Sequence, residues 1–197
     1  MTQAVQSSLG VPTCQEQQLL EKKLAAIRLL ALDVDGVLTD GSINMGNEGE
    51  LFKAFNAKDG MGISLALRNG LNVAIITGRK SAIIHNRAQE LGITELREGV
   101  KDKYGELKTL QEQLGLKQEQ VAYMGDDLND LPAFRASGLR LAPADAAAEV
   151  LAAADLVAEY QGGRGAVRYA IEMILKAQGK WESIIASYML SGQGDRQ

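Results

Sequence analysis

The residues best suited to chemistry stand at the ends of apolar runs. In LLALDVDG (residues 29–36), Asp33 ends such a run and Asp35 follows two residues later. Extended backbone places alternate side chains on one side, so both carboxylates could face the same crevice. Asp126 ends another apolar run, and the TGR segment (residues 77–79) ends a third. We expect these acids to gather around one divalent cation, because clustered carboxylates otherwise repel each other.

This set of groups is suited to phosphoryl transfer. Asp33 could attack phosphorus, and Asp35 could protonate the leaving oxygen and then deprotonate a water. Thr77, Lys103 and the cation would offset charge on the phosphoryl oxygens. The guanidinium group of Arg79 can donate two parallel hydrogen bonds to an anion. Oxygen ligands favour a hard ion, which makes Mg²⁺ the first choice over Mn²⁺ or Co²⁺ for a site made by Asp33, Asp35 and Asp126.

The elements that would position these groups alternate between strands and helices. Continuous apolar runs at 27–33, 72–77 and 121–126 are typical of parallel strands covered on both faces, and 139–144 and 155–160 are weaker strand candidates. Helical patterns lie at 59–70, 81–92, 102–115 and 165–180, with Ser81 and Gly92 as expected caps. The alternation predicts a doubly wound, mainly parallel α/β sheet, whose ligands bind beyond the carboxyl ends of the strands. The exception is a β-hairpin insertion, expected at about 39–58 after the first strand.

Composition limits the possible partners. The chain has 197 residues, a net charge of -4 and a single cysteine, Cys14. The acidic balance argues against nucleic acid, and the lone cysteine suits a reducing cytoplasm. No apolar run is long enough to span a membrane, and the N-terminus does not resemble a signal peptide. We expect a flexible arm over 1–24, one domain over 25–180 and a tail over 181–197.

Four segments, DVDGVLTDG, TGR, KDKYGEL and GDDLND, resemble in order the motifs of the haloacid dehalogenase (HAD) superfamily of phosphohydrolases. The resemblance implies that Asp33 is the nucleophile and Asp35 the acid/base, with Thr77 and Lys103 binding the phosphoryl group. It implies that Mg²⁺ is held by Asp33, Asp126 and the backbone carbonyl of Asp35. Asp127 and Asp130 would position these groups.

The segment LTDGSINMGNEGELFKAFNAKDGMGI (38–63) and the tail motif QGGRGAVRYAIEMIL resemble the 3-deoxy-D-manno-octulosonate 8-phosphate phosphatase family more closely. That resemblance implies a homotetramer without a large cap, and a flexible gate at the GGRG segment (162–165). The expected substrate-binding residues are Arg79, Lys53, Asp59 and Arg164, although Lys53 and Asp59 could equally be solvated. Two alternatives stay open: a phosphatase for a nine-carbon ulosonate phosphate, or a non-catalytic HAD-like oligomerisation module.

Overall fold

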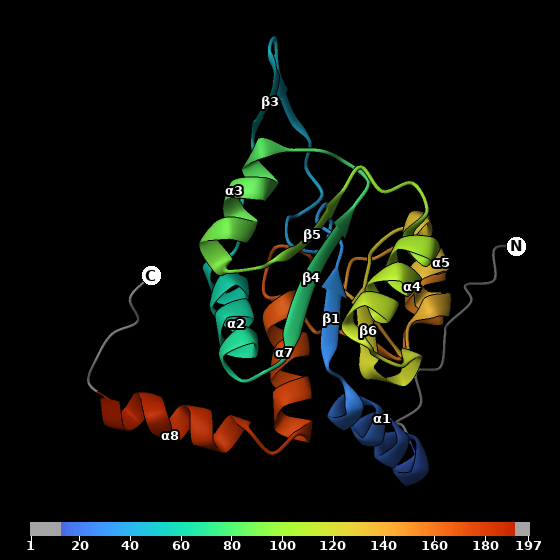
Figure 1. The fold of residues 1–197 in the computed structure, drawn as a ribbon, viewed down its shortest axis with the longest axis vertical. Coiled ribbons are helices and arrows are strands. Elements are labelled where there is room, and N and C mark those ends of the chain that lie inside the picture. The colour runs from blue at the N-terminus through green and yellow to red at the C-terminus, as the bar shows by residue number, and fades with distance from the viewer. Residues whose placement is uncertain (1–12, 192–197) are drawn as a thin grey trace, which may run out of the picture.

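A six-stranded parallel sheet lies at the centre of the computed structural model, which describes residues 13–191 (Figure 1). The strand order is β5-β4-β1-β6-β7-β8. The central strand β1 therefore lies between β4 and β6, as a convergence of the predicted acids requires. The predicted α/β fold class, with a hairpin outside the sheet, is confirmed. The strands are β1 (Leu29–Leu32), β4 (Asn72–Thr77), β5 (Glu95–Glu98), β6 (Val121–Met124), β7 (Leu139–Ala142) and β8 (Leu156–Val157).

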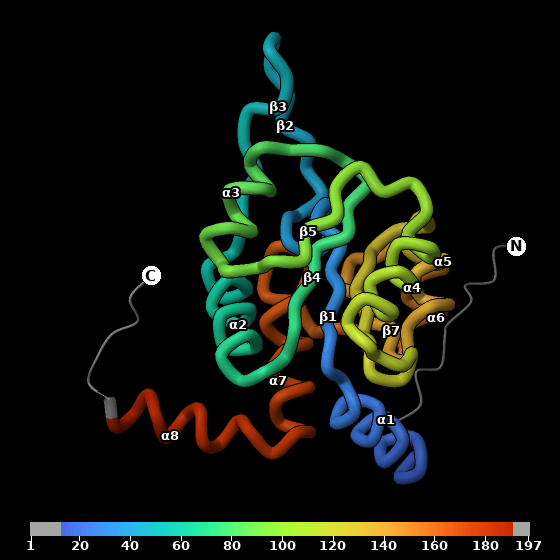
Figure 2. The backbone as a smooth tube through the Cα atoms, in the orientation of Figure 1, coloured from blue at the N-terminus to red at the C-terminus, as the bar shows by residue number. Residues whose placement is uncertain are grey.

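Helices cover both faces of the sheet (Figure 2). On one side lie α2 (Ala57–Arg68), α3 (Ala82–Leu91) and α7 (Ala166–Ala177), and on the other lie α4 (Lys103–Leu114), α5 (Leu131–Ala136) and α6 (Ala148–Ala153). Each side has its own apolar core. Every residue of β1 is buried, which explains why its sequence is a continuous apolar run. No helix in the described part of the chain is both long and apolar enough to cross a membrane.

Local signals set the helix boundaries. The Ser81 hydroxyl accepts a hydrogen bond from the backbone N–H of Ile84, and Gly92 ends α3 in the left-handed conformation. Both caps agree with the expectation from sequence. The strand β5 was not expected, because its sequence ELRE carries three charged residues. Among residues 13–191 it pairs with β4 alone and is an edge strand, where charged side chains can reach solvent.

The two ends of the described chain are helical. The expected loose arm over 1–24 is wrong for its second half, because α1 (Cys14–Ala26) begins there with a capping box between Thr13 and Glu16. This helix packs against α7. At the other end, α8 (Trp181–Ser191) follows α7 and runs away from it in Figure 1. Residues 1–12 and 192–197 lie outside the described part of the chain.

The predicted insertion is a two-stranded antiparallel hairpin that projects beyond the carboxyl ends of the sheet (Figure 1). It consists of β2 (Asn44–Gly46) and β3 (Gly49–Phe52), joined by a short turn. Four large apolar side chains on or next to it are exposed: Ile43, Met45, Leu51 and Phe52.

One carboxylate ties α1 to the edge of the sheet. Asp155 accepts a hydrogen bond from Lys23 of α1 (2.8 Å) and three from Arg140 of β7, through its Nε, its Nη2 and its backbone N–H. Burial raises the pKa of this carboxyl, but the bonds from Arg140 and Lys23 outweigh burial and lower the pKa to about 2. The charged form of Asp155 is therefore favoured in the folded protein.

We predict that Asp155→Asn lowers the free energy of unfolding by about 2 kcal/mol at pH 7. A carboxyl whose pKa is depressed by folding stabilises the fold above its unfolded pKa of about 4, and this contribution is lost as the pH falls toward 2. Urea unfolding of both proteins at pH 7 and at pH 3 measures the difference, which should shrink at the lower pH. Glu21→Gln, an exposed change on the same helix, should leave stability nearly unchanged. Equal losses at both pH values would contradict the prediction.

Candidate active site

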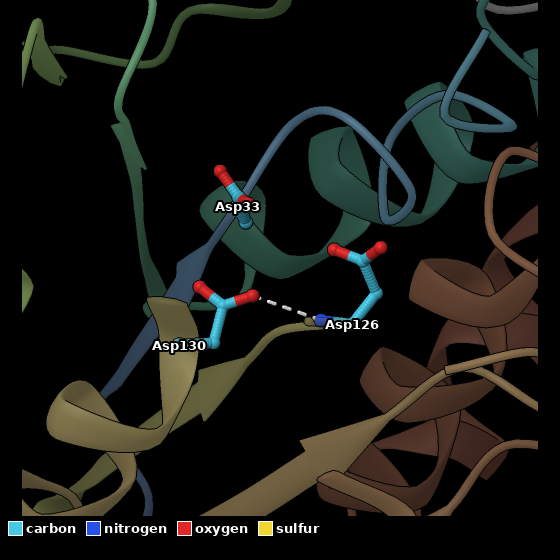
Figure 3. Close-up of side chains that lie close together, drawn as sticks. All are labelled: Asp33, Asp126 and Asp130. Atoms are coloured by element: carbon cyan, nitrogen blue, oxygen red, sulfur yellow. Dashed lines mark hydrogen bonds between the residues drawn. The ribbon is translucent and has the colours of Figure 1, made fainter. Parts of the chain in front are cut away.

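Asp33 and Asp126 come together at the carboxyl ends of neighbouring strands. Leu32 of β1 pairs with Met124 of β6, and the backbone N–H of Asp33 donates to the Met124 carbonyl (3.0 Å). Asp33 directly follows β1, and Asp126 follows β6 after one intervening residue, so both acids lie where the chain leaves the sheet. Oxygens of Asp33, Asp126 and Asp130 lie within 4.8 Å of one another, and Figure 3 shows the three carboxyl groups around a common space.

Asp130 belongs to the supporting structure of this cluster. One of its oxygens accepts hydrogen bonds from the Tyr123 hydroxyl (2.7 Å) and from Lys103 Nζ (2.7 Å). The other accepts from the backbone N–H groups of Asp126 (2.9 Å; Figure 3) and Asp127 (3.3 Å). With both oxygens engaged, Asp130 is less suited than Asp33 or Asp126 to bind a cation. Sequence reasoning missed Tyr123, because within VAYMGD it looks like one more apolar strand residue.

Lys103 links Asp130 to Asp33. It is the first residue of α4, its side chain is only 3% exposed, and its amine lies 2.9 Å from Asp33 Oδ2. Burial lowers the pKa of this amine, but the charges of Asp33 and Asp130 outweigh burial and raise the pKa above its ordinary value. The lysine therefore carries a positive charge against the carboxylate predicted to be the nucleophile.

The remaining negative charge fits a divalent cation. Burial and the neighbouring acids raise the pKa of Asp33 to about 6 and that of Asp126 to about 7. The shifts come first from burial of the carboxyls and then from repulsion between the acids, which the charge of Lys103 offsets only in part. Their donors are oxygens only, the ligands that Mg²⁺ prefers. The donor set therefore fits the expected magnesium ion.

Two glycines allow the close approach of these chains. Gly36 has φ +89°, and a Cβ built on it would lie 2.0 Å from a carboxylate oxygen of Asp126. A Cβ on Gly125 would lie 2.3 Å from the Cβ of Asp130. Side chains at either position would push the acids apart. The turn at Gly36 therefore leaves the space that the Asp126 carboxylate occupies.

Asp35 faces two cations. Its Oδ1 is hydrogen-bonded to Lys53 Nζ, and its Oδ2 lies 3.3 Å from Arg79 Nε. The side chain of Arg79 is 56% exposed, whereas that of Lys53 is 1% exposed. Burial lowers the pKa of Lys53, but its bonds to Asp35 and Glu50 outweigh burial and raise it.

A cavity of about 300 Å³ opens at this edge of the sheet. Its polar lining combines residues from three strand ends with part of the hairpin segment. Thr77 is buried in its wall, and the Thr77 hydroxyl accepts the backbone N–H of Arg79 (3.4 Å). The lining residues are Asp33, Asp35, Gly41, Ile43, Thr77, Gly78, Arg79, Asp126, Asp127 and Asn129.

Three of the expected substrate-binding residues lie outside this lining. Lys53 is enclosed between Asp35 and Glu50. The buried Asp59 carboxylate accepts the backbone N–H groups of Gly165 (3.2 Å) and Arg168 (2.7 Å), so it caps the start of α7. Arg164 is mostly exposed and pairs with Asp40 at 3.6 Å. Of the four expected residues, only Arg79 faces the cavity.

The GGRG segment, expected from the resemblance to be a flexible gate, is packed against the loop that follows Asp35. A Cβ on Gly162 would lie 1.8 Å from the carbonyl oxygen of Gly36, and the Gly163 N–H donates to the Val37 carbonyl (2.9 Å). The segment leads directly into α7, which has six buried residues. These glycines therefore support the loop that follows Asp35.

Comparisons with known proteins show which family the chain belongs to. Residues 93–171 match the family model of haloacid dehalogenase-like hydrolases. The chain is 51% identical over 158 residues to the 3-deoxy-D-manno-octulosonate 8-phosphate phosphatase of Escherichia coli K12, covering 80% of this chain and 84% of that protein. The chain belongs to this phosphatase family. The sequence resemblance is thereby confirmed.

Solved structures of the same family share the fold. The phosphatase from Yersinia pestis is 48% identical, with a TM-score of 0.80 over 82% of this chain and 88% of that one. The enzyme from Moraxella catarrhalis was solved with magnesium, phosphate and KDO (3-deoxy-D-manno-octulosonate). It is 40% identical, with a TM-score of 0.84 over 87% of this chain and 98% of that one. A Haemophilus influenzae relative, 41% identical with a TM-score of 0.82 over 85% and 99%, was solved with cobalt.

We predict that Gly36→Ala abolishes most Mg²⁺-dependent phosphatase activity, because the new methyl group would occupy the place of the Asp126 carboxylate. Gly70→Ala is a matched control: Gly70 has φ +77°, and its Cβ would meet nothing within 4 Å. Both changes should destabilise the fold by about 1–2 kcal/mol through backbone strain. Phosphate release and thermal unfolding measure the two effects. Similar activity in both variants would contradict the assigned role of Gly36.

Proposed function

We propose that this protein is a Mg²⁺-dependent phosphatase that converts 3-deoxy-D-manno-octulosonate 8-phosphate to KDO and inorganic phosphate. The observation that carries the proposal is the approach of Asp33 and Asp126 within one ion's reach, with Lys103 against Asp33. The substrate is supported by the names of relatives about 50% identical over most of their length.

In the proposed reaction, a carboxylate oxygen of Asp33 attacks phosphorus, and the bond from phosphorus to the sugar oxygen breaks. Asp35, which this step requires in its protonated form, gives its proton to that leaving oxygen. Asp35 then takes a proton from a water molecule, whose oxygen attacks the aspartyl-phosphate. Phosphate leaves, and the Asp33 carboxylate is restored. Support for these roles comes from the two carboxyl groups lining the same cavity.

The other groups act on charge and orientation. Lys103 would neutralise charge on the transferring phosphoryl oxygens, and the Thr77 hydroxyl would donate to one of them. Arg79, the exposed cation on the cavity wall, would hold the anionic sugar. Asp33, Asp126 and the Asp35 carbonyl would hold Mg²⁺, which supplies further positive charge against the phosphoryl group when bound.

The decisive experiment is phosphate release from two sugar phosphates, with and without Mg²⁺. We predict rapid release from the eight-carbon substrate only with Mg²⁺, and a loss of roughly a thousandfold or more in Asp33→Asn. A preference for a nine-carbon ulosonate phosphate would replace the substrate. No Mg²⁺-dependent release from any sugar phosphate would favour the non-catalytic oligomerisation module. Asp33→Asn should keep the oligomeric state of the wild type.

The tetramer expected from the resemblance is part of the proposal. Its support is the hairpin, where Met45, Leu51 and Phe52 are each more than half exposed in a single chain. Exposed apolar groups of this kind often mark contacts between proteins. A second copy on the hairpin would also wall the open side of the cavity, since Gly41 and Ile43 in the segment that leads into the hairpin line it.

We predict that Leu51→Ser shifts the protein toward smaller species, because it removes apolar area from the contact. Light scattering coupled to gel filtration measures the mass. Met189→Ser is the control, since Met189 is 83% exposed on α8, away from the hairpin. If Met189→Ser dissociates the protein and Leu51→Ser does not, the contact between copies lies on α8 and not on the hairpin.

The remaining parts of the proposal concern location and domain limits. We place the protein in the cytoplasm, supported by its single cysteine, which is exposed and free on α1. We assign the phosphatase domain to 14–180, which adds α1 to the expected range 25–180 because α1 packs against α7; the described sheet and the cavity-lining residues all lie within these limits.

A further inference from the structure

The hairpin places the buried side chain of Lys53 next to Asp35, the predicted acid/base. Lys53 directly follows β3, whose last residues, Leu51 and Phe52, are exposed. The Lys53 side chain turns inward and is 1% exposed. Its amine contacts Asp35 Oδ1 and lies 3.0 Å from Glu50 Oε1. A lysine enclosed in this way cannot reach a substrate in the cavity, whose lining does not include it.

Glu50 is itself held in place. Its second oxygen accepts the hydroxyl hydrogen of Ser81, the residue that caps α3. The backbone N–H of Ser81 in turn donates to Glu98 of β5 (2.9 Å). A series of contacts therefore connects the edge strand β5 to Ser81 at the start of α3 and from there to Glu50 of the hairpin. Glu50 in turn contacts Lys53, which contacts Asp35.

The two carboxylate oxygens of Asp35 have different partners. Oδ1 is bound by the buried amine of Lys53, whereas Oδ2 faces Arg79, which is exposed on the cavity wall. Lys53 thus fixes which oxygen is turned toward the cavity. Without the positive charge of Lys53, Asp35 and Glu50 would face each other as two like charges across the space that the amine occupies. We expect the Asp35 carboxylate to rotate away in that case.

We propose that Lys53, held by Glu50 and Ser81, is a positioning residue that orients the Asp35 carboxylate for proton transfer. The inference rests on the proposed function, because it takes Asp35 as the acid/base. It assigns the hairpin a role inside the active site of its own chain, separate from any contact with another copy. It also replaces the expectation that Lys53 binds substrate.

A double-mutant cycle tests whether Lys53 acts through Asp35. Lys53→Met, Asp35→Asn and the double variant are compared with the wild type, using the sugar phosphate and p-nitrophenyl phosphate with Mg²⁺. We expect Lys53→Met to lower kcat about tenfold or more, with KM changed less than about twofold. In the Asp35→Asn background the same change should alter kcat less than about twofold, because the positioned group is already gone.

Matched variants separate positioning from folding. Lys53→Arg should recover part of kcat, because it keeps the charge. Lys58→Met removes an exposed lysine nearby on α2 and should change neither kcat nor KM. Thermal unfolding of each variant shows whether the fold is kept. A loss in Lys53→Met that persists undiminished in the Asp35→Asn background, or that appears in KM, would overturn the proposal.

A crystal structure of Lys53→Met gives a readout that does not depend on turnover. We expect the Asp35 carboxylate to have left its position beside residue 53, and an unmoved carboxylate would overturn the proposal. Hydrolysis of p-nitrophenyl phosphate without hydrolysis of the sugar phosphate would remove the proposed substrate but leave the cycle valid. If neither compound is hydrolysed with Mg²⁺, the proposed function fails and the crystal structure alone decides the role of Lys53.

Discussion

The approach of Asp33 and Asp126 is the constraint on which the site depends. Burial raises the pKa of both carboxyls, and the neighbouring like charges add to the effect. Lys103 supplies one positive charge, which it shares with Asp130 as well as Asp33. The cluster therefore keeps negative charge that a divalent cation can neutralise. The repulsion between these acids is therefore the same property that favours binding of a cation between them.

The backbone of the fold holds these acids together in spite of the repulsion between them. β1 and β6 are neighbours, so their ends must lie together whatever the side chains prefer. Asp130 then fixes the loop after β6 through two backbone N–H groups, and Gly36 leaves room for the Asp126 carboxylate. Apolar packing on both faces of the sheet supplies the stability that holds these groups in an unfavourable arrangement.

Sequence reasoning reached the strand ends but not the side-chain partners. Asp33 and Asp126 could be predicted to meet, because apolar strands followed by acids carry a strong local signal. Strand β5 was missed because edge strands can be charged, and α1 because its few apolar residues give a weak helical pattern. Whether Asp59 faced the substrate or capped α7, and whether Lys53 faced solvent or Asp35, depended on contacts between segments far apart in the sequence.

The hairpin shows why those distant contacts matter for function. Three consecutive residues point to different surroundings: Leu51 and Phe52 to the outside, and Lys53 to Asp35. Such a short two-stranded element has few contacts of its own to hold it still. Its attachment through Glu50 to Ser81 supplies part of the missing rigidity within the chain. A second copy covering Leu51 and Phe52 would add to it, so that assembly and the orientation of Asp35 would be coupled through one strand.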